Sequence, residues 1–97
     1  MTFRLHPEAA LEHERQVAYY EEQSPGLGRR YHEATLRTIG KAVEAPQRFK
    51  VARPPDIRKI SLQGFKFWVI YRQVEGMVQV LAIAHYRRHP DYWVPRV

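Results

Sequence analysis

The sequence predicts an α+β domain in which a hairpin of two helices packs on one face of a small, mainly antiparallel sheet. Two patterns favour this fold class. Apolar residues recur at helical spacing in the first half of the chain and with strand-like alternation in the second half. A chain of 97 residues is close to the roughly 100 to 150 residues of a common domain. We therefore expect one domain over residues 1–97, with elements in the order β-α-α-β-β-β.

The first half predicts one short strand and two helices. Residues 2–6 place apolar side chains at alternate positions, which suits a strand. Pro7 favours a helix start, because its φ is already helical and its missing N–H would be unpaired there. That helix should end before Ser24-Pro25-Gly26, and a second apolar stripe from Leu27 to Val43 should end at Pro46. Two helices joined by so few residues pack as an antiparallel pair.

The second half predicts a loop and three strands. Residues 47–56 are bracketed by prolines and are expected to form the loop. Strands are predicted over 57–62, 65–72 and 77–85, with a hairpin turn at Val74-Glu75-Gly76-Met77.

The last strand is apolar on both of its faces, which indicates a central place in the sheet. Simple alternation puts Val80 and Ala82 on one face and Leu81 on the other. The helical hairpin would cover one face of the sheet, and the other would stay partly exposed.

Charge is unevenly divided along the chain, whose net charge is +6. Residues 1–45 carry six Lys or Arg against seven Glu, a balance of −1, whereas residues 46–97 carry ten against three acidic residues, a balance of +7. The second half is therefore a candidate surface for a polyanion: nucleic acid, an acidic protein segment or, less favoured, a membrane face. A solvated basic surface is the alternative.

Several classes of protein are excluded by what the sequence lacks. The longest apolar runs have five residues, far fewer than the ~20 that cross a bilayer, and the start of the chain does not resemble a signal peptide. We expect a cytoplasmic protein without a membrane partner. With no cysteine, disulfides, thiolate zinc sites and cysteine nucleophiles are excluded. Neither predicted helix carries a histidine pair at the i, i+4 spacing of a helical metal site. Gly26 and Gly28 lie between two helices rather than after a strand, so neither a metal nor a cofactor is expected.

The candidate site combines two strand arginines, Arg58 and Arg72, with the tail that follows the last strand, residues 85–93. These residues would lie near one another if the last three strands pair as consecutive hairpins. Guanidinium groups neutralise phosphates and aromatic rings stack on bases, so the mixture suits single-stranded RNA.

Metal-free phosphodiester transfer needs a proton acceptor, a proton donor and a cation. The natural candidates are His85, Tyr92, and Arg72 or Arg87. Each element also has a structural explanation. Tyr92 and Trp93 could close a small core, the Arg87-Arg88 pair could be solvated, and His85 could be a structural histidine at a strand end.

Taken together, the motifs of the chain resemble those of the ParE/RelE superfamily, the toxin halves of bacterial type II toxin-antitoxin, or plasmid stabilisation, modules. The residues that carry the resemblance are Tyr19-Tyr20-Glu21-Glu22, Ser24-Pro25-Gly26-Leu27-Gly28, Pro46, Ile57-Arg58-Lys59, Phe65, Ile70-Tyr71-Arg72, residues 85–90 and Tyr92-Trp93. The resemblance implies a compact α+β toxin that inhibits growth when free and is neutralised by a cognate antitoxin. An acidic, partly disordered antitoxin segment would also suit the basic half of the chain.

Two modes of action are implied by the resemblance: ParE-like members poison DNA gyrase and are not enzymes, and RelE-like members cut mRNA on the ribosome without a metal. The Ser24–Gly28 turn and the tail look closer to ParE, and the RelE lysine cluster has only partial counterparts in Lys59 and Lys66. We therefore expect a gyrase poison, with the ribosome-dependent mRNA endoribonuclease as the alternative. A third hypothesis is an inactive domain that serves only antitoxin or operator binding.

Residue roles follow from these two modes. In the RelE-like case the resemblance assigns catalysis to Arg58, Arg72, Arg87 and Tyr92. In either case the expected target-binding residues are Arg58, Arg72, His85, Arg87, Arg88, Tyr92 and Trp93.

Overall fold

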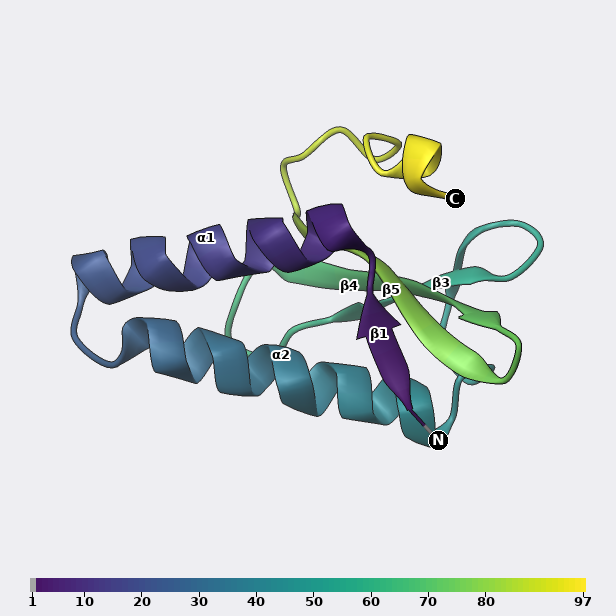
Figure 1. Cartoon of the computed structure of the whole chain (residues 1–97), viewed down its shortest axis with the longest axis horizontal. Helices are drawn as coiled ribbons and strands as arrows, with labels where there is room; N and C mark the ends of the chain where they lie inside the picture. The colour runs from purple at the N-terminus through teal and green to yellow at the C-terminus, as the bar shows by residue number, and fades with distance from the viewer. Residues whose placement is uncertain (1) are drawn as a thin grey trace.

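The computed structural model describes residues 2–97, and in it two antiparallel helices lie on one face of a five-stranded sheet (Figure 1). The helices are α1 (Pro7–Gln23) and α2 (Leu27–Glu44), and the strands are β1 (Phe3–Leu5), β2 (Val51–Arg53), β3 (Ile57–Ser61), β4 (Phe67–Val74) and β5 (Met77–His85). A single 3-10 turn, η1 (Val94–Arg96), ends the chain. The predicted α+β class and helical hairpin are confirmed.

Strand order in the sheet is β1-β5-β4-β3-β2, with β1 parallel to β5 and every other pair antiparallel. β5 lies between two strands, as predicted from its apolar faces. β2 is an addition to the expected order, because it forms in residues predicted to be a loop. It has three exposed residues and pairs with β3 in an irregular register, so it left no alternating pattern in the sequence.

The turn between the helices is shaped by two glycines and one carboxylate. Gly26 has a φ of 86°, in the left-handed region that glycine adopts without strain. Glu21 accepts hydrogen bonds from the N–H groups of Gly26, at 2.8 Å, and Gly28, at 3.1 Å, and so caps the start of α2. A Cβ on Gly28 would lie 2.4 Å from the carbonyl oxygen of Val17. The Ser24–Gly28 sequence therefore allows the two helices to approach closely.

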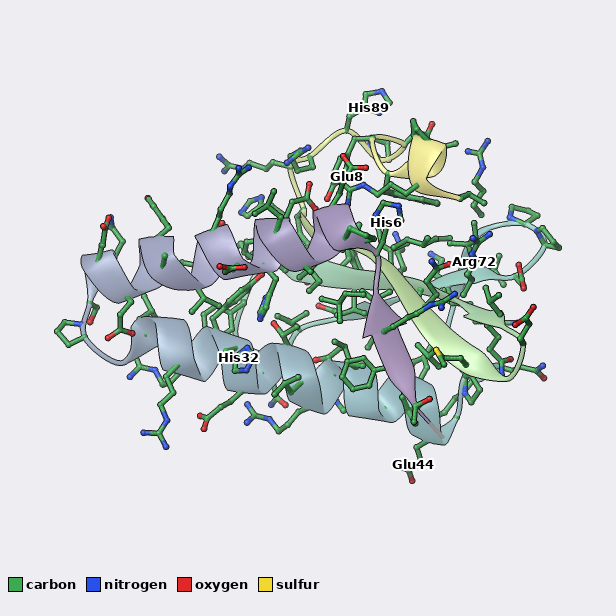
Figure 2. The ribbon with its side chains drawn as sticks, in the orientation of Figure 1. His6, Glu8, His32, Glu44, Arg72 and His89 are labelled. Atoms are coloured by element: carbon green, nitrogen blue, oxygen red, sulfur yellow. The ribbon has the colours of Figure 1, made fainter. Side chains whose placement is uncertain are left out.

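The larger core lies between the helical hairpin and the sheet, and we call it the helix-side core. Its buried members are Tyr31, Ala34, Ile39, Ala42, Ile60, Leu62, Phe67, Val69, Tyr71, Val78, Val80 and Ile83. Edge-to-face packing joins the ring of Tyr31 to those of Phe65 and Phe67, with centroids 5.3 and 5.1 Å apart. At its margin, His13 of α1 and His32 of α2 share a 2.8 Å hydrogen bond between Nε2 and Nδ1 (His32 is labelled in Figure 2).

A smaller core lies on the opposite face of the sheet, where the C-terminal tail, residues 86–97, crosses it. This tail-side core consists of Ile57, Ile70, Leu81, Ala82, Ala84 and Trp93. Trp93 is only 2% exposed, so the tail buries part of the face that the sequence predicted to be partly exposed. The prediction that aromatic residues of the tail close a small core is confirmed for Trp93.

A β-bulge in β5 corrects the predicted assignment of its faces. The register with β4 shifts between Ile70, which pairs with Ala82, and Tyr71, which pairs with Val80. Leu81 is the extra residue, and it joins Ala82 in the tail-side core while Val80 lies in the helix-side core. Simple alternation was therefore wrong at this point, because one inserted residue reverses the faces beyond it.

Candidate functional site at the C-terminal tail

An arginine near the end of the chain fixes the tail to α1. Arg96 makes two hydrogen bonds to the carboxylate of Glu12, Nη1 to Oε1 at 2.9 Å and Nη2 to Oε2 at 2.7 Å. Its Nη1 also donates to the carbonyl oxygen of Leu81 at 3.0 Å. The Arg96 side chain is 7% exposed, and hydrogen bonding to Glu12 raises its pKa above the ordinary value, so it stays charged. We call this pair the Glu12–Arg96 clamp.

The clamp also determines how Tyr92 is held. The Tyr92 hydroxyl donates to Oε1 of Glu12 at 3.3 Å. Two guanidinium carbons lie over its ring, that of Arg88 at 3.8 Å and that of Arg96 at 5.0 Å from the centroid. Burial, with the nearby charge of Glu12, raises the pKa of Tyr92. The hydroxyl therefore stays protonated and bonded within the protein, while Arg88 is held in place above the ring.

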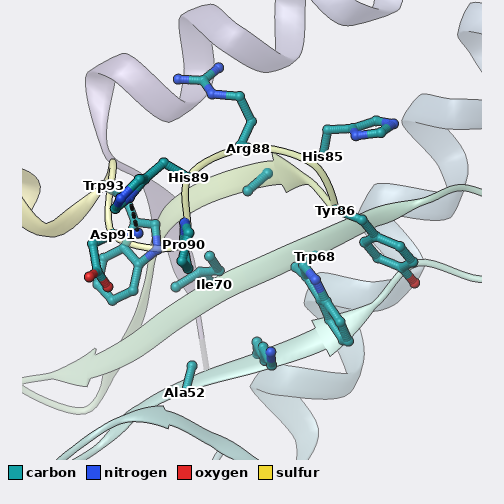
Figure 3. Close-up of a pocket in the computed structure, with 12 residues that line it drawn as sticks. Ala52, Trp68, Ile70, His85, Tyr86, Arg88, His89, Pro90, Asp91 and Trp93 are labelled. Atoms are coloured by element: carbon teal, nitrogen blue, oxygen red, sulfur yellow. Dashed lines mark hydrogen bonds between the residues drawn. The ribbon is translucent and has the colours of Figure 1, made fainter.

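One hollow of about 280 Å³ opens on the tail-side face of the sheet (Figure 3). On its floor the rings of Trp68 and Tyr86 lie 4.8 Å apart, and the Lys59 ammonium is 4.3 Å from the Trp68 ring. The Tyr86 hydroxyl is hydrogen-bonded to the hydroxyl of Ser61. At the other end of the hollow, the His89–Asp91 turn is closed by a 3.1 Å hydrogen bond from the Asp91 N–H to Nδ1 of His89.

A second hollow of about 670 Å³ lies between α1 and the tail, and its lining includes Arg15, Tyr19 and Tyr92. His85 and Arg88 line both hollows. Nδ1 of His85 accepts a hydrogen bond from the Arg87 N–H at 3.0 Å, and its ring packs edge-on against Phe67. The two hollows therefore meet around these side chains. We call the joined area the tail surface and define it by Arg15, Lys59, Trp68, His85, Tyr86 and Arg88.

The structure brings together only part of the predicted site. His85, Arg88 and Tyr92 lie at the tail surface. Trp93 also lines the first hollow, but it is a core residue that is only 2% exposed. Arg87 is exposed beside the surface and lines neither hollow.

Arg58 and Arg72 lie elsewhere, although β3, β4 and β5 do pair as consecutive hairpins. Arg58 is paired in register with Tyr71, the neighbour of Arg72, so the two arginines point to opposite faces of the sheet. Nη1 of Arg58 donates to the Phe49 carbonyl oxygen at 2.7 Å on the helix side. Nε of Arg72 donates to Oε1 of Gln79 at 2.9 Å (Figure 2).

Residues that the sequence-based site left out include Glu12, Arg15, Trp68 and Arg96. Glu12 and Arg96 are 84 residues apart in the chain, so no local pattern could pair them. Trp68 did carry a signal, because it alternates with the inward-facing Phe67 and Val69 and so had to face the other side of the sheet.

The tail surface offers cations, an imidazole and a tilted aromatic pair, groups that suit an anionic or aromatic ligand. Within residues 2–97 no group of three or more His, Asp or Glu side chains is placed to hold a metal ion. Nor does any helix in that range have the length and apolar character needed to cross a membrane.

Comparison with known proteins gives the family. A family model described as the ParE toxin of type II toxin-antitoxin system, parDE, matches residues 3–90, from β1 to the start of the tail. A solved structure described as the chromosomal ParDE TA system from P. aeruginosa contains a chain with the same fold, at a TM-score of 0.61 and 19% sequence identity, covering 88% of this chain and 95% of that one. Among curated proteins nothing matches. Because the family model spans nearly the whole chain, the protein belongs to the ParE toxin family of type II toxin-antitoxin systems.

Proposed function

We propose that this toxin stops growth in the cytoplasm by poisoning DNA gyrase, and that a cognate acidic antitoxin neutralises it. The tail surface would make the contact with gyrase. The observation that carries this proposal is the arrangement of Arg88, which lies 3.8 Å over the ring of Tyr92 while Glu12 and Arg96 hold that ring in place. A cation fixed in advance loses little conformational entropy on binding.

The composition of the tail surface favours protein recognition. Arginine, tryptophan and tyrosine provide most of the strongly contributing residues of protein interfaces. Here Arg88, Trp68 and Tyr86 line one hollow, and Arg15 and Tyr19 extend the same surface across α1. A partner could therefore insert an acidic or aromatic side chain at the point where the two hollows meet.

Binding is better supported than RNA cleavage. The residues assigned to RelE-like catalysis are Arg58, Arg72, Arg87 and Tyr92. Arg58 and Arg72 lie on opposite faces of the sheet, and the Tyr92 hydroxyl is bonded to Glu12. A general acid, a general base and a phosphate-binding cation must converge within hydrogen-bond reach of one phosphate. We therefore treat mRNA cleavage as an outcome to be tested.

The proposed antitoxin interaction rests on charge. Residues 46–97 carry ten Lys or Arg against three acidic residues, and the exposed cations of the tail surface are drawn from this half apart from Arg15. An acidic segment that folds on binding would cover Arg88 and Lys59 and block access by gyrase.

A gyrase cleavage assay tests the proposal. Purified toxin is incubated with gyrase, ATP and supercoiled plasmid, and linear DNA is measured after detergent and protease treatment. We expect linear DNA to accumulate, and Arg88→Ala together with Lys59→Ala to reduce it at least about 10-fold, which corresponds to a loss of about 1.4 kcal/mol in binding. Arg29→Ala is the matched control, since Arg29 is an exposed α2 residue paired with Glu33.

Parallel assays separate the alternatives. Cleavage of mRNA on programmed ribosomes without gyrase-dependent DNA cleavage would overturn the gyrase proposal in favour of the endoribonuclease. Neither activity, in a folded protein whose expression does not slow growth, would favour the inactive binding domain. Arg58→Ala and Arg72→Ala should leave gyrase poisoning unchanged if the tail surface is the contact.

The antitoxin proposal is tested in cells. We expect the gene next to that of the toxin to encode a small acidic protein; this neighbour is co-expressed with the toxin, and growth and complex formation are followed. We expect the neighbour to restore growth and to co-purify with the wild-type toxin. Normal growth of cells that express the toxin alone would contradict the proposal that the chain inhibits growth and needs an antitoxin.

A further inference from the structure

A second basic surface lies along α2, away from the tail. Arg30, Arg37 and Lys41 are seven and four residues apart. At 3.6 residues per turn these positions stay within about 40° of one another around the helix axis. Arg48 continues the row past the end of α2. We call these four residues the α2 stripe.

The stripe lines three neighbouring hollows along α2, which together we call the groove. A first hollow of about 510 Å³ is lined by Arg30, Arg37 and Phe65, among others. Arg37 and Lys41 also line a second hollow of about 90 Å³, together with Gln63. Lys41 and Arg48 then line a third hollow of about 210 Å³. Because each hollow shares a cation with the next, the four positive charges follow one path.

The charges of the stripe are not neutralised by the protein. Within residues 2–97, none of the four side chains forms an ion pair with a carboxylate. Glu33 lines the first hollow and is paired with Arg29 at 3.5 Å. Glu44 lines the third hollow and marks the less positive end of the groove. A row of unpaired cations is maintained at some cost in mutual repulsion, which points to an anionic partner.

The spacing and polarity of the groove favour a phosphate backbone over an acidic protein segment. From Arg30 to Lys41 the helix rises about 16 Å, the length of about five phosphates on one strand of duplex DNA. The large apolar side chains that line the groove, Leu27, Phe49 and Phe65, are partly buried, and Phe49 and Phe65 pack against the helix-side core. A folding peptide needs apolar anchors to offset its ordering entropy, whereas a duplex is already ordered.

We propose that the α2 stripe binds the phosphate backbone of duplex DNA, without reading its sequence. This goes beyond gyrase poisoning and does not depend on it, since the binding is between the toxin and DNA alone. Arg37 and Lys41 are the central contacts, because each borders two hollows. Because the cations of the stripe would contact phosphates rather than base edges, the affinity should depend strongly on salt and little on base sequence.

Fluorescence anisotropy with a labelled 20-base-pair duplex, in the absence of gyrase, tests this proposal. The dissociation constant is measured at several salt concentrations between 25 and 200 mM, and log Kd is plotted against log salt. We expect Arg37→Gln and Lys41→Gln each to lower the slope by about 0.9, the value for one lost phosphate contact. Two duplexes of unrelated sequence should give the same result.

Arg29→Gln is the matched control. Arg29 is next to Arg30 of the stripe in sequence, and its charge is already paired with that of Glu33. Its slope should equal that of the wild type. All three positions are exposed, and far-ultraviolet circular dichroism checks that each variant is folded.

Two results would overturn the proposal. The first is a slope that changes no more for Arg37→Gln and Lys41→Gln than for Arg29→Gln. The second is binding of a labelled oligoglutamate peptide through the same two residues with no binding of DNA, which would assign the stripe to an acidic protein. Because gyrase is absent, either result leaves the gyrase assay to be judged by itself.

Discussion

The two faces of the sheet are covered in different ways. On one face, a hairpin of two long helices buries twelve residues. On the other, six buried residues lie under a short tail, which is held by the Trp93 indole and by ion pairs of Arg96 with Glu12 and Glu8 and of Asp91 with Arg53. The helix side therefore contributes most of the folding energy. The tail side is held by few contacts, and these same contacts place the side chains that a partner would meet.

The largest loss of stability is expected from the helix-side core. Ile39 is 1% exposed, and Ile39→Ala should lower the free energy of unfolding by about 3 kcal/mol, because it removes buried methyl groups and leaves a cavity. Urea denaturation followed by circular dichroism measures this. Leu36→Ala on the same helix is the control. Leu36 is 44% exposed, so its replacement should change the free energy of unfolding by less than about 0.5 kcal/mol. Equal losses for the two variants would contradict the assignment.

Trp93→Ala should cost less than Ile39→Ala, about 2 kcal/mol, although burial of tryptophan usually contributes more. The reason is that the tail can detach while the hairpin and sheet remain folded. Limited trypsin digestion should then cut after Arg87 and Arg88 while the rest of the domain resists. If the variant instead unfolds as a whole, with a loss greater than that of Ile39→Ala, the two faces are not separable. Val97→Ala, an exposed tail residue, should behave as the wild type.

Glu12→Gln should cost about 1 to 2 kcal/mol, because it removes the carboxylate that is hydrogen-bonded to the largely buried guanidinium of Arg96 and leaves only the more distant, exposed Glu8. The loss should be accompanied by faster trypsin cleavage of the tail. Glu8→Gln is a matched control, since its carboxylate is 3.9 Å from Nε of Arg96 and its side chain is 67% exposed, which predicts a loss below about 0.5 kcal/mol. If both variants lose the same amount, the clamp does not hold the tail.

The smallest effect at neutral pH, and one that grows with acid, is expected at His13. Burial, helped by the nearby His32, lowers the pKa of His13 from 6.5 to about 4. Between pH 6.5 and about 4, His13 binds a proton in the unfolded chain but not in the folded protein. The stability present above pH 6.5 is therefore lost as the pH falls toward 4, with a slope of at most about 1.4 kcal/mol per pH unit.

Urea midpoints measured from pH 7.5 to 4 should show this loss in the wild type and a shallower one in His13→Gln. His89→Gln, at an exposed position of the tail, is the control and should keep the wild-type profile. A His13→Gln profile as steep as that of the wild type would assign the acid sensitivity to other groups.

The sequence predicted the helix side better than the tail side, for physical reasons. Both helices begin and end within two residues of their predicted bounds, because Pro7, the Ser24–Gly28 turn and Pro46 act locally. The bulge at Leu81 could not be predicted from alternation. β5 is apolar on both faces, so one extra apolar residue does not change the pattern of polar and apolar positions. β2 was missed because three exposed residues carry no periodicity.

For the site, the sequence predicted which types of residue take part but not where those residues lie in the fold. His85, Arg88 and Tyr92 do lie near one another, as their closeness in sequence predicted. The register that separates Arg58 from Arg72 is set by the pairing of Arg58 with Tyr71, which a single sequence does not reveal. Glu12 and Arg96 have no local signal, and only the folded chain brings them together.

The pairing of β1 with β5 has a consequence for the timing of synthesis. Phe3, Arg4 and Leu5 pair with Val78, Gln79 and Val80, and the Glu12–Arg96 clamp joins residues that are 84 positions apart. Contacts of such wide sequence separation cannot form until the later partner has left the ribosome. The tail surface therefore cannot form until the residues of the tail have left the ribosome, and it is among the last parts of the fold to be assembled.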